Sequence, residues 1–119
     1  MMQKDKFFFS VIKIKPSDTE YLDEIAELEK LLIPCPWSRN VFDIEVKKEN
    51  SIILGAVCDE KIVGYLTADT VLDEVNLTNI AVSKEYQNNG IAQNLFSALI
   101  ENLDEQKYVF LEVRESNII

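Results

Sequence analysis

The spacing of hydrophobic and polar residues predicts alternating strands and helices along the chain. A stretch rich in β-branched and aromatic residues, Phe7–Lys15, ends at a proline and predicts a strand. A helix is expected from about Asp18 to Leu32, preceded by the S-x-x-E pattern of a capping box at Ser17-Asp18-Thr19-Glu20. Its apolar stripe contains Leu22, Ile25, Leu28 (or Glu29) and Leu32.

The other face of this first helix is acidic. It is expected to hold six carboxylates and one lysine: Asp18, Glu20, Asp23, Glu24, Glu27, Glu29 and Lys30. A solvated helix face is the favoured explanation, and the alternative is an acidic rim that attracts a basic peptide.

A proline-bounded segment with a single tryptophan follows. Pro34-Cys35-Pro36 ends the first helix, and Ser38 is the expected N-cap of a second helix that reaches about Lys48. Trp37 lies between the two. A lone tryptophan after a proline is typical of a core anchor, and it also suits the wall of a substrate groove, so both interpretations stay open.

Three strands are expected next. Ile52–Cys58 and Ile62–Thr70 are separated by a tight polar turn and predict a hairpin, and Leu72-Asp73-Glu74 turns the chain into a third strand that includes Leu77–Val82. The three strands form a meander.

The last part of the chain predicts a crossover. After Gly90 a helix with a wide apolar face runs to about Asp104, and Tyr108–Val113 is a nearly continuous apolar strand. A strand-helix-strand connection of this length places the last strand parallel to Leu77–Val82. The order is β-α-α-β-β-β-α-β, which predicts one α/β (α+β) domain with a mixed sheet over residues 1–119.

Composition narrows the function classes. A net charge of -9, from 12 basic and 21 acidic residues, argues against nucleic acid or an anionic membrane surface as partner and favours a cationic substrate. Without histidine the chain cannot form a Ser-His-Asp triad, a Cys-His dyad or a common Cys/His zinc site. With no apolar run near ~20 residues and no signal peptide pattern, we expect a cytoplasmic protein with two reduced, partly buried thiols, Cys35 and Cys58.

The stretch Val75–Ala92 has the pattern of an anion site. A strand, a polar loop and a helix N-terminus meet there, and such a terminus holds phosphate through unpaired backbone N–H groups. Gly90 allows close approach of a ligand, and Ala92 keeps the first turn narrow. A pantetheine arm would pair with strand backbone while its pyrophosphate sits on the N–H groups of residues 88–92. A glycine at an ordinary strand-loop-helix turn is the alternative explanation.

A carboxylate stands out in the last strand. Glu112 is expected on the same face as Tyr108, Phe110 and Arg114, and burial of a carboxylate raises its pKa and suits a general base. An ion pair with Arg114 or a place at a wet sheet edge explains it equally well.

Five short motifs in order resemble the GNAT acetyltransferases. The segment Gln87-Asn88-Asn89-Gly90-Ile91-Ala92 fits their Q/R-x-x-G-x-G/A signature. More narrowly, five motifs resemble the RimI branch, the ribosomal-protein-alanine N-acetyltransferases: PWS at residues 36–38, LDE at 72–74, NIAV at 79–82, YQ-x-x-G at 86–90 and LEVR-x-SN at 111–117. The resemblance covers nearly the whole chain.

This resemblance implies a GNAT fold that transfers acetyl from acetyl-CoA to the N-terminal α-amine of a protein, without a metal. Glu112 takes the role of proton acceptor, and direct transfer needs no cysteine intermediate. The implied acetyl-CoA contacts are Ile80, Ala81, Val82, Gln87, Asn88, Asn89, Gly90, Ile91, Ala92, Gln93 and Asn117.

Two departures from the family pattern bear on activity. The phosphate loop is neutral, with Lys84 as the nearest cation, which predicts weaker cofactor affinity. The chain stops at Ile119, before the helix that carries the family's general-acid tyrosine, so no general acid is assigned and the final helix and strands are expected to be lacking. An acetyl-CoA-binding module or an inactive fragment without turnover is the alternative function.

The expected partner is a protein N-terminus, basic as in a ribosomal protein. The uncovered sheet edge is also expected to favour a dimer.

Overall fold

The predicted order of strands and helices is confirmed in a computed structural model of the chain, which describes residues 8–103 and the backbone of 108–110. One short 3₁₀ helix, η1, is added after the fourth strand. The elements are β1 (Ser10–Lys13), α1 (Thr19–Leu32), α2 (Arg39–Val46), β2 (Ser51–Cys58), β3 (Lys61–Val71), β4 (Glu74–Val82), η1 (Lys84–Tyr86), α3 (Ile91–Glu101) and β5 (Tyr108–Phe110).

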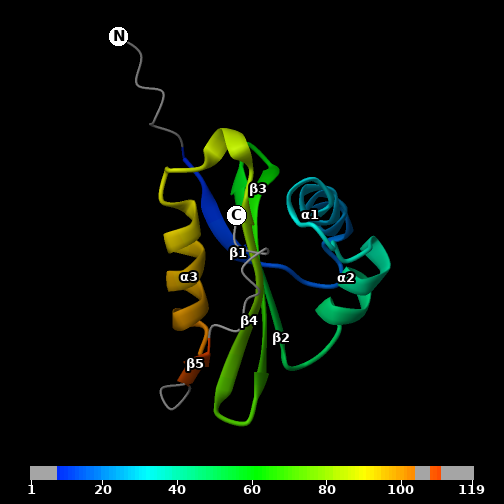
Figure 1. Cartoon of the computed structure of the whole chain (residues 1–119), viewed down its shortest axis with the longest axis vertical. Helices are drawn as coiled ribbons and strands as arrows, with labels where there is room; N and C mark the ends of the chain where they lie inside the picture. Colours follow the sequence, from blue (N-terminus) through cyan, green and yellow to red (C-terminus); the bar gives the residue numbers. More distant parts are fainter. Residues whose placement is uncertain (1–7, 104–107, 111–119) are drawn as a thin grey trace.

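The strands form one mixed sheet in the order β1-β2-β3-β4-β5. Neighbours from β1 to β4 are antiparallel, and β5 lies parallel to β4 with Val75 opposite Val109. The predicted meander and the parallel crossover are therefore confirmed. Helix α3 covers one face of the sheet, and α1 and α2 cover the other (Figure 1).

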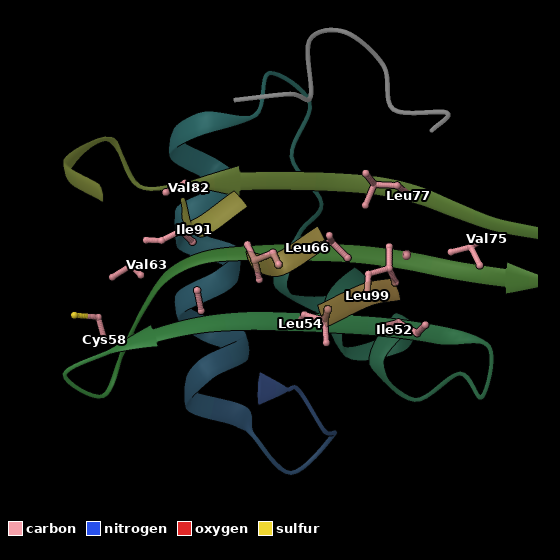
Figure 2. Packing of buried hydrophobic residues seen from close by; sticks show 13 residues of the cluster. Ile52, Leu54, Cys58, Val63, Leu66, Val75, Leu77, Val82, Ile91 and Leu99 are labelled. Atoms are coloured by element: carbon pink, nitrogen blue, oxygen red, sulfur yellow. The ribbon is translucent and has the colours of Figure 1, made fainter. Parts of the chain in front are cut away.

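Each face of the sheet has its own hydrophobic core. The core under α3 draws Leu54 and Leu66 from the strands and Leu95 and Leu99 from the helix, as Figure 2 shows in part. The opposite core contains ten buried residues, namely Ile14, Leu22, Ile25, Leu28, Ile33, Phe42, Ile53, Ile62, Tyr65 and Ala81. Among the described residues, no helix is long and apolar enough to cross a membrane.

The starts of the first strand and first helix differ from the prediction. Strand β1 begins at Ser10, and Phe8, inside the predicted strand, is exposed. Helix α1 has Asp18 rather than Ser17 as its N-cap, and no side chain caps it. The capping box does not form because the Asp18 carboxylate accepts the N–H of Lys15 at 2.8 Å instead.

Local turn chemistry explains most of the remaining boundaries. Ser38 caps α2 as predicted, with its Oγ accepting the N–H of Val41 at 3.3 Å. The turn between β2 and β3 has Asp59 and Glu60 at φ 52° and 66°, which suits a two-residue hairpin. Of the two cysteines predicted to be partly buried, Cys58 is buried and Cys35 is exposed, because Cys35 lies in the loop between the prolines.

Strand β4 contains a β-bulge at Thr78. Thr67 pairs with Asn79 and Ala68 pairs with Leu77, so Thr78 has no opposite residue on β3. The bulge reverses the alternation of side chains: Val75 and Leu77 face α3, whereas Asn79 and Ala81 face α1 and α2. Bulges of this kind commonly re-aim side chains next to active sites.

Candidate functional site

A hollow of about 380 Å³ lies where β4 ends and α3 begins. Seven of its eight lining residues are predicted cofactor contacts, and the eighth, Tyr86, was not predicted. The lining consists of Val82, Tyr86, Gln87, Asn88, Gly90, Ile91, Ala92 and Gln93. The YQ-x-x-G motif at residues 86–90 contained the available signal for Tyr86.

The first turn of α3 faces this hollow with its backbone donors. The N-cap, Gly90, provides no side chain, and the first turn contains no acidic residue. The N–H groups of Ile91, Ala92 and Gln93 have no partner within the helix. A phosphate placed here accepts those N–H groups at the positive end of the helix dipole.

The loop before α3 is braced by its own amide side chains. Asn89 Nδ2 donates to the carbonyls of Tyr86 at 3.2 Å and Gln87 at 3.0 Å, and Gln87 Nε2 donates to the Val82 carbonyl at 2.9 Å. Asn89 therefore shapes the loop, and its side chain does not line the hollow. Asn94 Nδ2 in the helix donates to the Gly90 carbonyl at 2.7 Å.

Two residues of this loop have left-handed backbone. Asn88 has φ 67° and Gly90 has φ 79°. Asparagine tolerates this region better than most residues, and glycine adopts it without steric cost. The turn that aims α3 at the hollow thus depends on the residue types at both positions.

The side of β4 that faces away from β3 offers backbone groups that lead away from the hollow. Ser83 donates its N–H to the Val63 carbonyl at 2.8 Å, and hydrogen-bonded pairs alternate along an antiparallel ladder. The backbone groups of Ile80 and Val82 therefore point to the side on which β5 pairs, whereas those of Ala81 face β3. This geometry favours Ile80 and Val82 over Ala81 as backbone partners of a ligand.

Two predicted site residues lie outside the described residues. Glu112 and Asn117 follow β5 in the chain, and their roles stay predictions. Lys84, the nearest cation in the sequence, is exposed in η1. Within the described part of the chain, no group of three or more acidic or cysteine side chains is arranged to hold a metal ion.

A buried carboxylate on α1 was missed by the sequence analysis. Glu29 was assigned to the acidic outer face, but it is 0% exposed. Its Oε1 accepts the Tyr65 hydroxyl at 2.6 Å and the Asn79 amide at 2.9 Å, and its Oε2 accepts the N–H of Trp37 at 2.6 Å. We call these four residues the Glu29 hub. Three donors compensate the desolvation of the charge, which explains why it can lie inside.

The hub changes the properties of its tyrosine. Burial first, and the hydrogen bond to Glu29 second, raise the pKa of the Tyr65 hydroxyl far above its ordinary value. The Tyr65 phenol therefore stays a proton donor to the carboxylate across the physiological range.

The remaining acidic residues of α1 divide between surface and structure. Asp23 forms an exposed ion pair with Arg39 at 2.6 Å, and Glu24 accepts the N–H of Ile62 at 2.7 Å. Trp37 packs edge-on against Phe42 with ring centroids 5.2 Å apart and stays partly exposed. Trp37 is thus a partial core anchor, and its exposed part leaves the groove-wall interpretation open.

The mixed sheet, with a hollow at the start of the helix after β4, is that of a family of acetyl-CoA-dependent enzymes. Residues 18–119 match the Acetyltransferase (GNAT) family, and the chain belongs to this family. Its fold is the GNAT fold, and its class is acetyl-CoA-dependent N-acetyltransferase.

Relatives within the family are more specific. The [Ribosomal protein bS18]-alanine N-acetyltransferase of Haemophilus influenzae is 35% identical over 109 residues, covering 90% of this chain and 72% of the relative. The protein of the same name from Salmonella typhimurium is 32% identical over 93 residues, covering 76% of this chain and 62% of the relative. The chain thus spans about two thirds of the length of these relatives.

Solved structures agree with this placement. The ribosomal-protein-S18-alanine N-acetyltransferase from Escherichia coli superposes with a TM-score of 0.78 at 28% identity, covering 92% of this chain and 70% of that one. An aminoglycoside acetyltransferase from a soil metagenome reaches a TM-score of 0.75 at 19% identity, which shows the shared fold alone.

Proposed function

We propose that the chain transfers an acetyl group from acetyl-CoA to the N-terminal α-amine of a cytoplasmic protein, of the ribosomal-protein-alanine type. The similarity to relatives named bS18-alanine N-acetyltransferases carries this proposal, at 35% identity over 90% of the chain. The net charge of -9 supports a basic acceptor such as a ribosomal protein.

The hollow fits the anionic end of acetyl-CoA. The N–H groups at the start of α3 bind the pyrophosphate, and the left-handed Gly90 lets it approach the backbone closely. The pantetheine arm of acetyl-CoA follows β4, where the backbone groups of Val82 and Ile80 point toward it and can pair with its amides. The lack of a cation among the residues that line the hollow leaves binding to backbone dipoles and predicts modest affinity.

The proposed reaction is a direct transfer. The neutral amine nitrogen forms a bond to the acetyl carbonyl carbon, the carbon–sulfur bond breaks, and the thiolate leaves and takes up a proton. Glu112 accepts the proton that the amine loses, directly or through water. An α-amine has a pKa near ~8, so removing its proton near neutral pH costs little free energy and is within reach of a carboxylate, acting directly or through water.

Transfer to a defined peptide tests this function. The substrate is a peptide with the N-terminal sequence of ribosomal protein bS18, and the measurement is acetylated product by mass spectrometry. The control is the same peptide with a blocked N-terminus. Product from the free peptide alone is the expected result.

Calorimetry with acetyl-CoA distinguishes the other outcomes. Saturable binding of acetyl-CoA with no product from any free peptide would indicate that the chain is a binding module and not an enzyme. No binding of acetyl-CoA would overturn the assignment of the hollow.

A further inference from the structure

The segment 33–38, which joins α1 to α2, has an exposed, proline-restricted stretch at 34–36 and is tied to the interior by the buried carboxylate of Glu29. Pro34 and Pro36 restrict its backbone, and both are exposed. Besides the buried Ile33 and the packing of Trp37 on Phe42, its attachment is the N–H of Trp37, which donates to Glu29 Oε2 at 2.6 Å. The carboxylate of Glu29 therefore fixes the backbone of the segment at Trp37, next to its exposed proline stretch.

The same carboxylate reaches β4 beside the path proposed for the acetyl-CoA arm. Glu29 Oε1 accepts the amide of Asn79 at 2.9 Å, and Asn79 directly precedes Ile80 on the strand. Val82, which lines the hollow, is three residues or ~10 Å further along β4. An extended arm that starts at the hollow and follows the strand brings its thioester end close to Asn79.

We propose that Glu29 is a positioning residue for the acceptor. It holds segment 33–38 beside the thioester end of the arm, so that the entering protein N-terminus lies between Trp37 and β4. This inference rests on the proposed function and adds which part of the chain forms the acceptor wall.

The hydrogen bonds of the Glu29 hub indicate that Glu29 positions segment 33–38 and does not merely fill space in the core. An apolar side chain on α1 would fill the same space without the desolvation of a charge. The carboxylate instead makes directional bonds to three separate parts of the fold: Tyr65 on β3, Asn79 on β4 and Trp37 in the segment. Such bonds set the distance and orientation of the segment relative to β4.

A pair of glutamate variants on one helix tests the proposal. In Glu29→Gln an amide NH₂ must face one of the three donors, so segment 33–38 loses its fixed position. The matched control is Glu24→Gln, because Glu24 also lies on α1 and accepts a backbone N–H, that of Ile62, away from the segment. Steady-state kinetics with the acceptor peptide and calorimetry with acetyl-CoA are measured for both.

The expected result is a split between the two substrates. Glu29→Gln raises the KM for the acceptor peptide about tenfold and changes the Kd for acetyl-CoA less than twofold. Glu24→Gln leaves both within twofold of wild type. An unchanged acceptor KM in Glu29→Gln, or an equal loss in acceptor KM and acetyl-CoA Kd, would overturn the positioning role.

Tryptophan fluorescence separates a failure of this inference from a failure of the proposed function. Trp37 is the single tryptophan of the chain, so its emission and its quenching by acrylamide report on the segment even without turnover. Both change in Glu29→Gln and stay as in wild type in Glu24→Gln. Emission and quenching unchanged in both variants would refute the anchor, whereas absent acetyl transfer by the wild type would refute only the function.

A milder variant covers the case in which Glu29→Gln does not fold. Tyr65→Phe keeps the buried ring and removes one of the three donors, so a smaller rise of about threefold in acceptor KM is expected. Wild-type acceptor KM in this variant would count against the hub.

Discussion

At the scale of single residues, the left-handed backbone of Gly90 connects the loop to the first turn of α3. An added Cβ meets only Asn94 Nδ2 at 3.8 Å, so space is available, but φ is +79°. The cost of a side chain at this position is therefore conformational and not steric.

Gly90→Ala is expected to weaken acetyl-CoA binding by about fivefold, because about 1 kcal/mol of backbone strain is relieved by turning the loop away from the helix start. Calorimetric titration with acetyl-CoA measures this change. Ser97→Ala, on the exposed face of the same helix, is the control and keeps wild-type affinity. Equal affinity of Gly90→Ala and wild type would contradict the phosphate site.

The raised pKa of Tyr65 predicts a specific response to alkaline pH. The unfolded tyrosine ionises near pH ~10, and the buried one stays protonated, so the unfolded state binds fewer protons above that pH. Stability from this group is fully present below pH ~10 and is lost as pH rises further. Urea unfolding of wild type and Tyr65→Phe is expected to show their difference shrinking by ~1.4 kcal/mol per pH unit above pH ~10. Parallel pH curves would contradict this prediction.

The burial of Glu29 could not be predicted from the sequence pattern. Its helical position is next to the apolar stripe, and the pattern left Leu28 or Glu29 as alternatives on that stripe. Polarity alone assigned Glu29 to solvent, because its partners Tyr65 and Asn79 lie 36 and 50 residues away along the chain. Sequence periodicity carries no information about such distant donors, so the buried carboxylate needed the tertiary structure.

At the scale of elements, close packing of α3 on β3 places the hollow. A Cβ added at Gly64 would meet Ile91 Cγ2 at 3.1 Å and the Ala81 carbonyl at 3.2 Å. Because Ile91 is the first residue of α3, any displacement there moves the N–H groups that face the hollow.

Gly64→Ala is expected to lower the free energy of unfolding by about 1–3 kcal/mol and to weaken acetyl-CoA binding as well. Gly55→Ala is a matched control, since its Cβ would meet Ile62 Cδ1 at 2.8 Å and Ile14 Cδ1 at 3.1 Å in the opposite core. That variant is expected to lose stability but keep its affinity for acetyl-CoA. Urea unfolding and calorimetry measure the two effects, and a Gly64→Ala protein with intact affinity would refute the coupling.

Element types were predictable because each has a strong local signal. Helical spacing of apolar residues indicated α1 and α3, Ser38 indicated the start of α2, and β-branched runs indicated the strands. The start of α1 was not predictable, because the choice between Ser17 and Asp18 as N-cap depends on a bond from Lys15. The bulge at Thr78 was not predicted, because the change of apolar positions from Val75 and Leu77 to Ile80 and Val82 also fits an ordinary strand that is buried on both faces.

At the scale of the whole molecule, the charge of -9 bears on the choice of acceptor. A negative protein attracts a basic peptide through a field that salt screens within about 10 Å at ~0.1 M. The exposed carboxylates of α1 contribute to this field.

The KM for a lysine-rich or arginine-rich acceptor peptide is expected to rise severalfold between ~0.05 M and ~0.3 M salt, because screening weakens the attraction. An uncharged peptide with the same first residues is the control and shows little change. Peptide kinetics at graded salt concentrations measure both. Equal salt dependence of the two peptides would argue against a basic acceptor.

The family was predictable at this scale, as was the gathering of seven proposed cofactor contacts around one hollow, because these residues lie in order along one strand-loop-helix unit. The catalytic Glu112 and the cofactor contact Asn117 remain predictions, as does a dimer through the sheet edge. The acceptor wall was not predictable, because it is built by α1, β3, β4 and the segment 33–38 together.

The bulge at Thr78 makes the length of β4 as important as its composition. Deleting a residue that separates buried ones, such as Asn76 or Ile80, would turn one of its neighbours to the wrong side of the sheet, whereas deleting Thr78 removes the bulge and leaves plain alternation with every side chain on its present side. Substitutions at Thr78 leave the number of residues in β4 unchanged. In a comprehensive library of variants, deletion of Asn76 or Ile80 is therefore expected to be depleted far more strongly than deletion of Thr78 or amino-acid replacements there.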